Sequence, residues 1–231
     1  MKIILSPSKT ASYQTIAELP QLDLLYPTRT KKLVSTIRKM NQTTLSKALH
    51  VNGDLLKQTY HEYKNFYKSP GYQAFPSFTG LVFKQLDRDH YTSADYHYIQ
   101  THVRIFDALY GVLTPGTLIK PYRLDMKSSL GFNLYSYWDV DDAFEDELII
   151  NLASNEFSKM MSQPMISIEF YTTKNGRLQS LATYSKMARG QMLNYLIKHH
   201  ITTRDGIQQF DCDNYRYDPT RSTADTYVFI R

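Results

Sequence analysis

Apolar residues recur along the chain at two spacings, one typical of helices and one typical of strands. Positions three or four apart share one face of a helix. One such set follows Thr28 and Thr30, either of which can cap a helix, and it comprises Leu33, Ile37 and Met40. A second set, in a helix that starts near Asn52, comprises Leu56, Tyr60, Tyr63 and Tyr67. Its helical period favours a core face over a surface that stacks on bases.

The clearest helical pattern begins at Thr92, which with Asp95 resembles a capping box. The apolar positions that follow at helical spacing are Ile99, Val103, Phe106 and Tyr110. Gly111 is a natural terminator, so the pattern predicts one helix over 92–110. Pro115 and Gly116 then predict a type II turn, and Pro121 excludes a smooth helix over 118–126.

Alternation gives the best strand signal. The run from Ile166 to Phe170 alternates apolar and polar residues, Asn175-Gly176 suits a hairpin turn, and 178–184 forms the predicted return strand. The apolar run from Ile3 to Leu5 predicts a short buried strand. A last long helix is predicted over 188–200.

These elements do not alternate regularly, which favours an α+β or irregular mixed α/β fold. No linker, repeat or low-complexity tract interrupts the chain, so we expect a single domain over 1–231. Hydrophobic residues make up 42% and charged residues 21%, as in ordinary globular proteins. We find no apolar run of membrane length and no secretory signal. Since Cys212 is the single cysteine, no disulfide within the chain is possible, and we expect a cytoplasmic protein.

Charged residues are unevenly distributed along the chain, and this bears on the kind of partner it binds. The net charge is +5, with nine Lys or Arg and two acidic residues over 29–68 and six Asp or Glu over 139–147. Each run alone is typical of a solvated face. Their segregation favours a field that steers an anionic partner.

The loop from Ser6 to Thr10 directly follows the first predicted strand and offers hydroxyls and the ammonium group of Lys9. Loops at such positions commonly bind anions, because backbone N–H groups converge there. The loop lacks the glycines of a P-loop, and a plain turn is the alternative interpretation.

Two further segments carry cations suited to phosphate. Arg104, Lys120 and Arg123 bracket the Pro-Gly turn, and a guanidinium donates two parallel hydrogen bonds to phosphate. Lys186 and Arg189 lie where the hairpin joins the following helix, near a helix N-terminus that attracts anions.

No metal or nucleophile signature accompanies these cations. The sequence has no Cys/His cluster at metal spacing, no His-Glu-x-x-His and no Gly-x-Ser-x-Gly. We therefore expect no metal, no cofactor and no catalytic residue. Ser154, between Asn151 and Glu156, is either a helix cap or part of a site.

Seven segments, in order, resemble the YaaA family of peroxide-stress-response proteins. They are 6–10 (Ser-Pro-Ser-Lys-Thr), 78–83, 109–115, 120–126, 134–138, 151–156 and 186–190. Ser8 stands where the family usually has alanine. The stretch between Trp138 and Asn151 is shorter than is usual and strongly acidic.

The resemblance implies a compact mixed α/β fold with a positively charged cleft and a helix-hairpin-helix element, which we place at Arg104 to Arg123. It implies a cytoplasmic protein that binds DNA, limits oxidative damage to DNA and lowers intracellular iron. Contacts to phosphate alone predict binding without sequence preference. The residues expected to hold phosphate are Ser6, Lys9, Thr10, Arg104, Lys120, Tyr122, Arg123, Lys186 and Arg189. The alternative is an enzyme acting on a nucleotide or other phosphorylated small molecule in a basic pocket.

Overall fold

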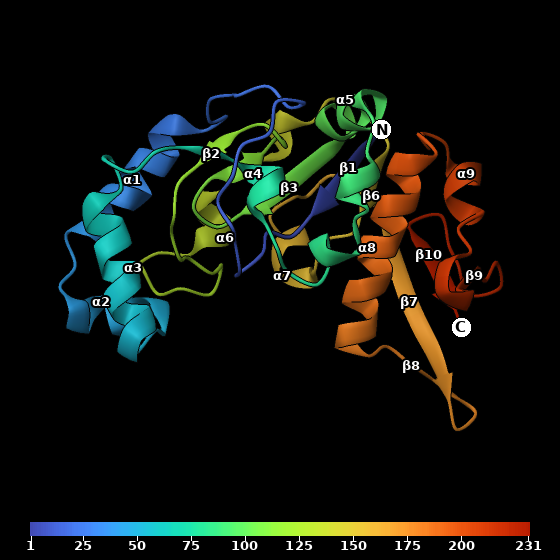
Figure 1. Cartoon of the computed structure of the whole chain (residues 1–231). Coiled ribbons are helices and arrows are strands. Elements are labelled where there is room, and N and C mark those ends of the chain that lie inside the picture. The colour runs from blue at the N-terminus through green and yellow to red at the C-terminus, as the bar shows by residue number, and fades with distance from the viewer.

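The computed structural model describes residues 1–231 and is built around one mixed eight-stranded sheet (Figure 1). The strand order is β4-β3-β1-β6-β7-β10-β9, and β8 pairs with β7. These strands are β1 (Lys2–Leu5), β3 (Val103–Asp107), β4 (Gly111–Leu113), β6 (Ile149–Asn151), β7 (Ile166–Lys174), β8 (Arg177–Gln179), β9 (Arg216–Tyr217) and β10 (Thr226–Ile230). A small second sheet pairs β2 (Tyr72–Gln73) with β5 (Leu118–Ile119).

The first strand lies between two parallel neighbours. Ile3 is paired with Val103 of β3 on one side and with Ile150 of β6 on the other. Residues 3–5 are fully buried, as expected for a parallel strand covered on both faces, and the predicted N-terminal strand is confirmed. From β1 the chain continues to β3 on one side and then to β6 on the other, so a topological switch point lies at β1.

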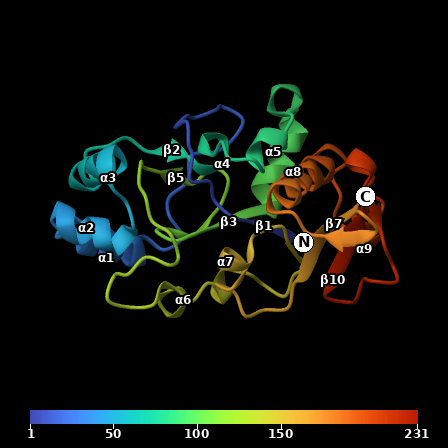
Figure 2. The same cartoon turned by 90° about the horizontal axis from the view of Figure 1, so that it is seen from below.

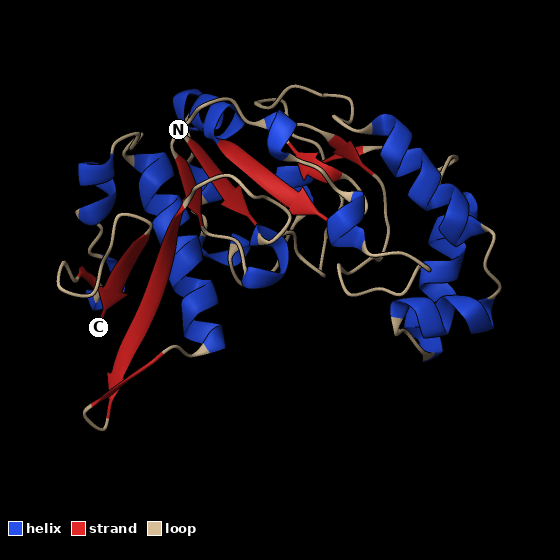
Figure 3. Ribbon diagram, turned by 180° about the vertical axis from the view of Figure 1, so that it is seen from behind, coloured by secondary structure: helices blue, strands red, loops and turns tan.

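Helices cover both faces of the sheet (Figure 2): α5 (Ser93–His102) and α8 (Ala182–Lys198) lie on one face, and α7 (Asn155–Ser158) lies on the other. The helices α1 (Pro27–Arg38), α2 (Gln42–Leu49) and α3 (Gly53–Asn65) gather at one end of the molecule (Figure 3). At the opposite end the β7–β8 hairpin projects beyond the sheet. The remaining helices are α4 (Ala74–Ser77), α6 (Leu134–Tyr137) and α9 (Arg204–Gln208), with 3-10 helices at Phe83–Gln85, Arg88–His90, Asp141–Ala143 and Cys212–Asn214.

The predicted helix over 92–110 is correct only in its first half. The capping box of Thr92 and Asp95 is present, but α5 ends at His102 and β3 begins at Val103. The apolar positions from Val103 onward belong to a strand that is buried on both faces, which spacing alone does not distinguish from a helix. Pairing with β1 satisfies the backbone groups that a longer helix would have paired internally.

The helix-hairpin-helix element placed at Arg104 to Arg123 is therefore wrong. This segment forms β3, β4 and β5 joined by turns, and β4 runs antiparallel to β3. Gly111 has a φ of +77° and begins β4 instead of ending a helix.

In the C-terminal third the predicted hairpin is confirmed. Asn175 and Gly176 have φ values of 53° and 72°, as a tight hairpin turn of this sequence requires. The return strand is shorter than predicted, because β8 ends at Gln179 and α8 begins at Ala182. Lys186 and Arg189 consequently lie within α8 and not at its junction with the hairpin.

The predicted N-terminal helices are also present, with different details. The helix α1 begins at Pro27, so Thr28 and Thr30 lie inside it and do not cap it. On α3, Tyr63 is buried in the core as predicted, whereas Tyr67 follows the helix and is exposed. One cluster of 57 buried apolar residues runs from β1 to β10. None of the helices is both long and apolar enough to cross a membrane.

Gly190 allows α8 to pack closely on the segment 82–85. A Cβ atom there would lie 2.2 Å from the carbonyl oxygen of Val82 and 2.8 Å from Cβ of Gln85. We expect Gly190→Ala to lower the free energy of unfolding by about 1–3 kcal/mol, the usual cost of overpacking, although alanine is the better helix former. Urea unfolding followed by circular dichroism measures the change. An unchanged or higher free energy of unfolding would contradict this packing role.

Candidate functional site

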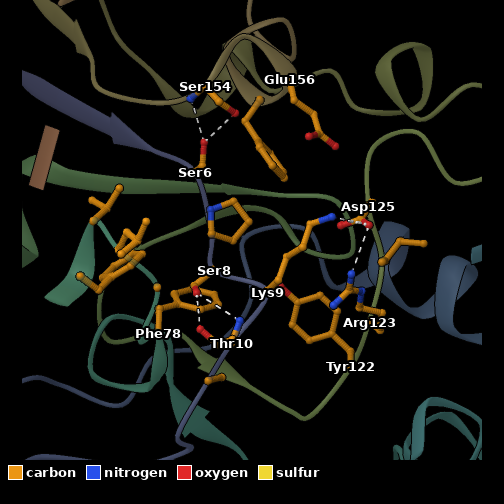
Figure 4. A pocket seen from close by; sticks show the side chains of 18 of the residues that line it. Ser6, Ser8, Lys9, Thr10, Phe78, Tyr122, Arg123, Asp125, Ser154 and Glu156 are labelled. Carbon is orange, nitrogen blue, oxygen red and sulfur yellow. Dashed lines mark hydrogen bonds and ion pairs between the residues drawn. The ribbon is translucent and has the colours of Figure 1, made fainter. Parts of the chain in front are cut away.

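A cavity of about 590 Å³ opens beside the carboxyl ends of β1 and β6. This edge is the topological switch point, where open α/β sheets usually bind their ligands. Six parts of the chain line the cavity: the loop after β1, the helix α3, residues 78–83, residues 122–125, residues 152–157 and the first two turns of α8. Figure 4 shows side chains from most of these segments converging on it.

The loop after β1 is tied to the segment after β6. Ser6 Oγ donates to Ser154 Oγ at 3.1 Å and accepts the backbone amide of Ser154 at 2.9 Å (Figure 4). Ser154 precedes α7, but its side chain makes no capping hydrogen bond. Ser8 Oγ accepts the amide of Thr10 at 3.1 Å, and a Cβ atom on Gly80 would lie 2.4 Å from the same oxygen. Both neighbouring segments therefore hold the loop in place.

Asp125 binds two of the predicted cations at once. Lys9 Nζ lies 2.9 Å from Asp125 Oδ2, and Arg123 Nη2 lies 3.6 Å from the same oxygen (Figure 4). The Arg123 Nε atom is buried without a hydrogen-bond partner. This carboxylate neutralises part of the local positive charge and holds both side chains at the cavity wall.

Tyr122 presents its ring to the cavity and directs its hydroxyl toward a buried carboxylate. The hydroxyl donates to Asp107 Oδ2 at the end of β3, and Asp107 Oδ1 accepts the amides of Leu109 at 2.8 Å and Tyr110 at 3.0 Å. Burial raises the pKa of Asp107 to about 6 and raises the pKa of Tyr122 above its ordinary value. Asp107 therefore stabilises the β3–β4 turn and the orientation of Tyr122 together.

Like Lys186, Arg189 is a lining cation without an ion-pair or hydrogen-bond partner in the protein. It is half-buried on α8, lines the cavity, and forms no ion pair or side-chain hydrogen bond; its Nε atom is buried without a partner. Burial lowers the pKa of its guanidinium group. Lys186, one turn earlier on α8, is exposed and lines the same wall. A desolvated cation without a partner is unfavourable for the protein alone, and it favours the binding of an anion.

The chain is similar in sequence to a known protein family over nearly its whole length. Residues 1–221 match the family model described as "Peroxide stress protein YaaA". The chain belongs to this family of peroxide stress proteins. Similar full-length relatives include UPF0246 proteins of Acaryochloris marina, 34% identical over 254 residues with all of both chains covered, and of Marinomonas sp., 34% identical over 252 residues with 100% and 97% covered. The UPF0246 protein of Finegoldia magna is 32% identical over 241 residues, with 100% and 98% covered.

The structure brings together seven of the nine residues expected to hold phosphate in this YaaA-family chain. These are Ser6, Lys9, Thr10, Tyr122, Arg123, Lys186 and Arg189. Arg104 lies outside the cavity near the start of β3, where its guanidinium donates to the carbonyl oxygens of Gln100 and Val103. Lys120 also lies outside, with its ammonium 5.6 Å from the centre of the Phe66 ring.

Sequence reasoning missed the wall that α3 contributes. Its lining residues are Leu55, Gln58, Thr59 and Glu62. Their spacing places them on one face of the helix. The sequence pattern indicated only the neighbouring apolar face, which packs on the core. It also missed Arg88, which donates to the carbonyl oxygens of Phe75, Pro76 and Phe78 and so shapes the segment that leads into the cavity.

The lining of the cavity carries both signs of charge. Four cations (Lys9, Arg123, Lys186 and Arg189) face three carboxylates (Glu62, Asp125 and Glu156). The basic run over 29–68 contributes none of these cations, since its lining residues are those of α3. No group of three or more His, Cys, Asp or Glu residues is arranged to hold a metal ion.

The raised pKa of Asp107 predicts how the free energy of unfolding depends on pH. Its pKa rises from 3.8 to about 6 on folding, so between these values the folded chain keeps a proton that the unfolded chain releases. The corresponding stability is complete below about pH 4 and is lost as the pH rises through about 6. We expect the free energy of unfolding of the wild type, relative to Asp107→Asn, to fall by about 2 kcal/mol from pH 4 to pH 7 in urea titrations. A difference that does not vary with pH would contradict the raised pKa.

Replacing Arg189 is expected to stabilise the folded protein, although this residue lines the cavity. Arg189→Met keeps the apolar stem and removes an unpaired, half-buried charge, so we expect the free energy of unfolding to rise by about 1 kcal/mol. Urea unfolding in a buffer without phosphate measures this. Lys57→Met is the matched control, because Lys57 is exposed and paired with Asp54, and its effect should stay within about 0.5 kcal/mol. A less stable Arg189→Met variant would show that the guanidinium has a partner within the protein.

Proposed function

We propose that this protein acts in the peroxide stress response by binding DNA through its phosphate groups, without sequence preference. The observation that carries the proposal is the guanidinium of Arg189, half-buried at the cavity and without a protein partner. A phosphate oxygen is a strong acceptor for such a group, and the planar guanidinium binds it through two hydrogen bonds.

Other lining residues also offer charges and hydrogen-bond donors that suit a phosphate group. Lys186 stands one turn from Arg189 on the same helix, and the Arg123 guanidinium has one buried Nε–H without a partner. Ser8 and Thr10 add hydroxyl groups on the facing loop. The basic run over 29–68 lies outside the cavity and attracts DNA at longer range, in a manner that salt screens.

Bound protein would cover DNA and lower the access of oxidants to it, which is the protective role that the resemblance implies. We propose that this action takes place on chromosomal DNA in the cytoplasm. We further propose that the protein lowers available intracellular iron under peroxide stress. Measuring chelatable iron in cells that lack the protein, with and without the restored gene, tests this second effect; equal iron levels would contradict it.

A second candidate function is that of an enzyme acting on a nucleotide or other phosphorylated small molecule. The observation that favours it is the position of the cavity, a concave site of about 590 Å³ at the switch point of the sheet. Its mixed lining of carboxylates and cations is also more selective than backbone binding needs. Thermal unfolding with nucleotides at millimolar concentration tests it; no stabilisation by any nucleotide would count against it.

The DNA proposal predicts a salt-dependent affinity that depends on Arg189. Fluorescence anisotropy with a labelled duplex should show an affinity that falls steeply with salt. Arg189→Ala should weaken binding by about 10-fold or more and reduce the salt slope by about 1. Arg177→Ala is the control, since it removes the same charge from an exposed position on β8, outside both the cavity and the basic run. If both variants bind like the wild type, the cavity does not hold a DNA phosphate.

A further inference from the structure

The two ends of the molecule place different chemistry in the lining of the cavity. Helices α3 and α8 both contribute lining residues. They lie apart in the fold, α3 in the α1–α3 group and α8 beside β7 (Figures 1 and 2). From α8 come the cations Lys186 and Arg189. From α3 comes a wall without cations, formed by Leu55, Gln58, Thr59 and Glu62.

The α3 wall holds hydrogen-bonding groups that are not fully used. Glu62 is half-buried and has no cation partner; its one hydrogen bond is from Gln58 Nε2 to Oε1, at 2.8 Å. The second carboxylate oxygen of Glu62 remains free. The hydroxyl of Thr59 is buried and has no hydrogen-bond partner. Burial raises the pKa of Glu62, as expected for a carboxylate that lacks compensating donors.

The opposite charges on the two walls do not satisfy each other. Neither Glu62 nor Arg189 takes part in an ion pair. Aromatic rings of Tyr13, Phe78 and Phe157 line the space with them, which suits a flat apolar group. A ligand that complements this arrangement carries an anion at one end and N–H donors on a planar ring at the other.

From these two walls we infer that the cavity binds one nucleotide unit, with its phosphate at Arg189 and Lys186 and the N–H edge of its base at Gln58 and Glu62. The inference rests on the proposed function for the phosphate end and extends it to the base. The unit comes either from a free nucleotide or from a terminal or unpaired nucleotide of a DNA strand, since both present the same groups.

Guanine fits the α3 wall best among the four bases. Its pairing edge offers one acceptor, O6, followed by two donors on N1 and N2. The amide nitrogen of Gln58 can donate to the acceptor, and the carboxylate of Glu62 can accept from both donors. Adenine, cytosine and thymine each lack the adjacent pair of N–H donors that a carboxylate binds in two-point contact.

Titration calorimetry with dGMP, dAMP, dCMP and TMP tests the inference directly. We expect the wild type to bind dGMP about 10-fold more tightly than the others. Glu62→Gln should abolish that preference and Gln58→Ala should reduce it. Both variants should fold, since Gln58 is exposed and the Glu62 change preserves shape. Asp54→Asn removes an exposed carboxylate from the start of α3 and should keep the preference.

A second arm uses duplexes with a single unpaired 3′ nucleotide, either G or T, and a blunt duplex. A preference for the G overhang identifies DNA as the source, and preference for free dGMP alone identifies a small molecule; either outcome supports the nucleotide unit.

Equal binding of all bases in both arms, or a preference for guanine that survives Glu62→Gln, overturns the inference. If Arg189→Ala weakens DNA binding while no base preference exists, the proposed function stands and this inference fails. If dGMP is preferred while Arg189→Ala leaves DNA binding unchanged, the inference stands and the DNA proposal fails.

Discussion

Parallel pairing of β1 with β3 on one side and β6 on the other is the constraint on which the site depends. It brings the carboxyl ends of β1 and β6 to one edge of the sheet, so that Ser6 and Ser154 share two hydrogen bonds across 148 positions of sequence. The cavity opens at this edge, beside the carboxyl ends of β1 and β6. Segments from both ends of the molecule then close around the opening, which explains why its lining is drawn from so many parts of the chain.

The position of Arg189 depends on close packing one residue further along α8. Gly190 lets the helix approach the carbonyl group of Val82, while Ala188 and Met192 are buried on the core side. The backbone is therefore held tightly, and the guanidinium keeps its place at the cavity although it has no partner there. Binding sites commonly retain such unfavourable arrangements, because the surrounding core supplies the stability that they lack.

The residues suited to attract an anion from a distance and those suited to bind it lie in different parts of this molecule. Several cations of the basic run are engaged at the surface away from the cavity: Lys57 with Asp54, Lys64 with the carbonyl oxygen of Arg38, and Arg38 over the ring of Tyr67. Inside the cavity, Asp125 partly neutralises Lys9 and Arg123, and α8 carries the two unpaired cations, Lys186 and Arg189. A diffuse positive field acts over distances that salt shortens, whereas a half-buried guanidinium acts only at contact and is screened much less.

The sequence by itself determined the features that arise between near neighbours. The cap formed by Thr92 and Asp95 and the turn at Asn175-Gly176 need only local backbone and side-chain contacts, and both are present. The apolar run at 3–5 also predicted a buried strand, although the strands that pair with it lie far away in the sequence. Only the tertiary structure decided that Val103 begins a strand, because its hydrogen bonds go to β1, about a hundred residues earlier. Residue type likewise identified the cations, but their pairing depended on which segments the sheet brought together. Asp125 lies beside Arg123, Arg189 forms no ion pair or hydrogen bond, and α3 faces the cavity. Burial and ion pairing of this kind are set by long-range packing that no local pattern records.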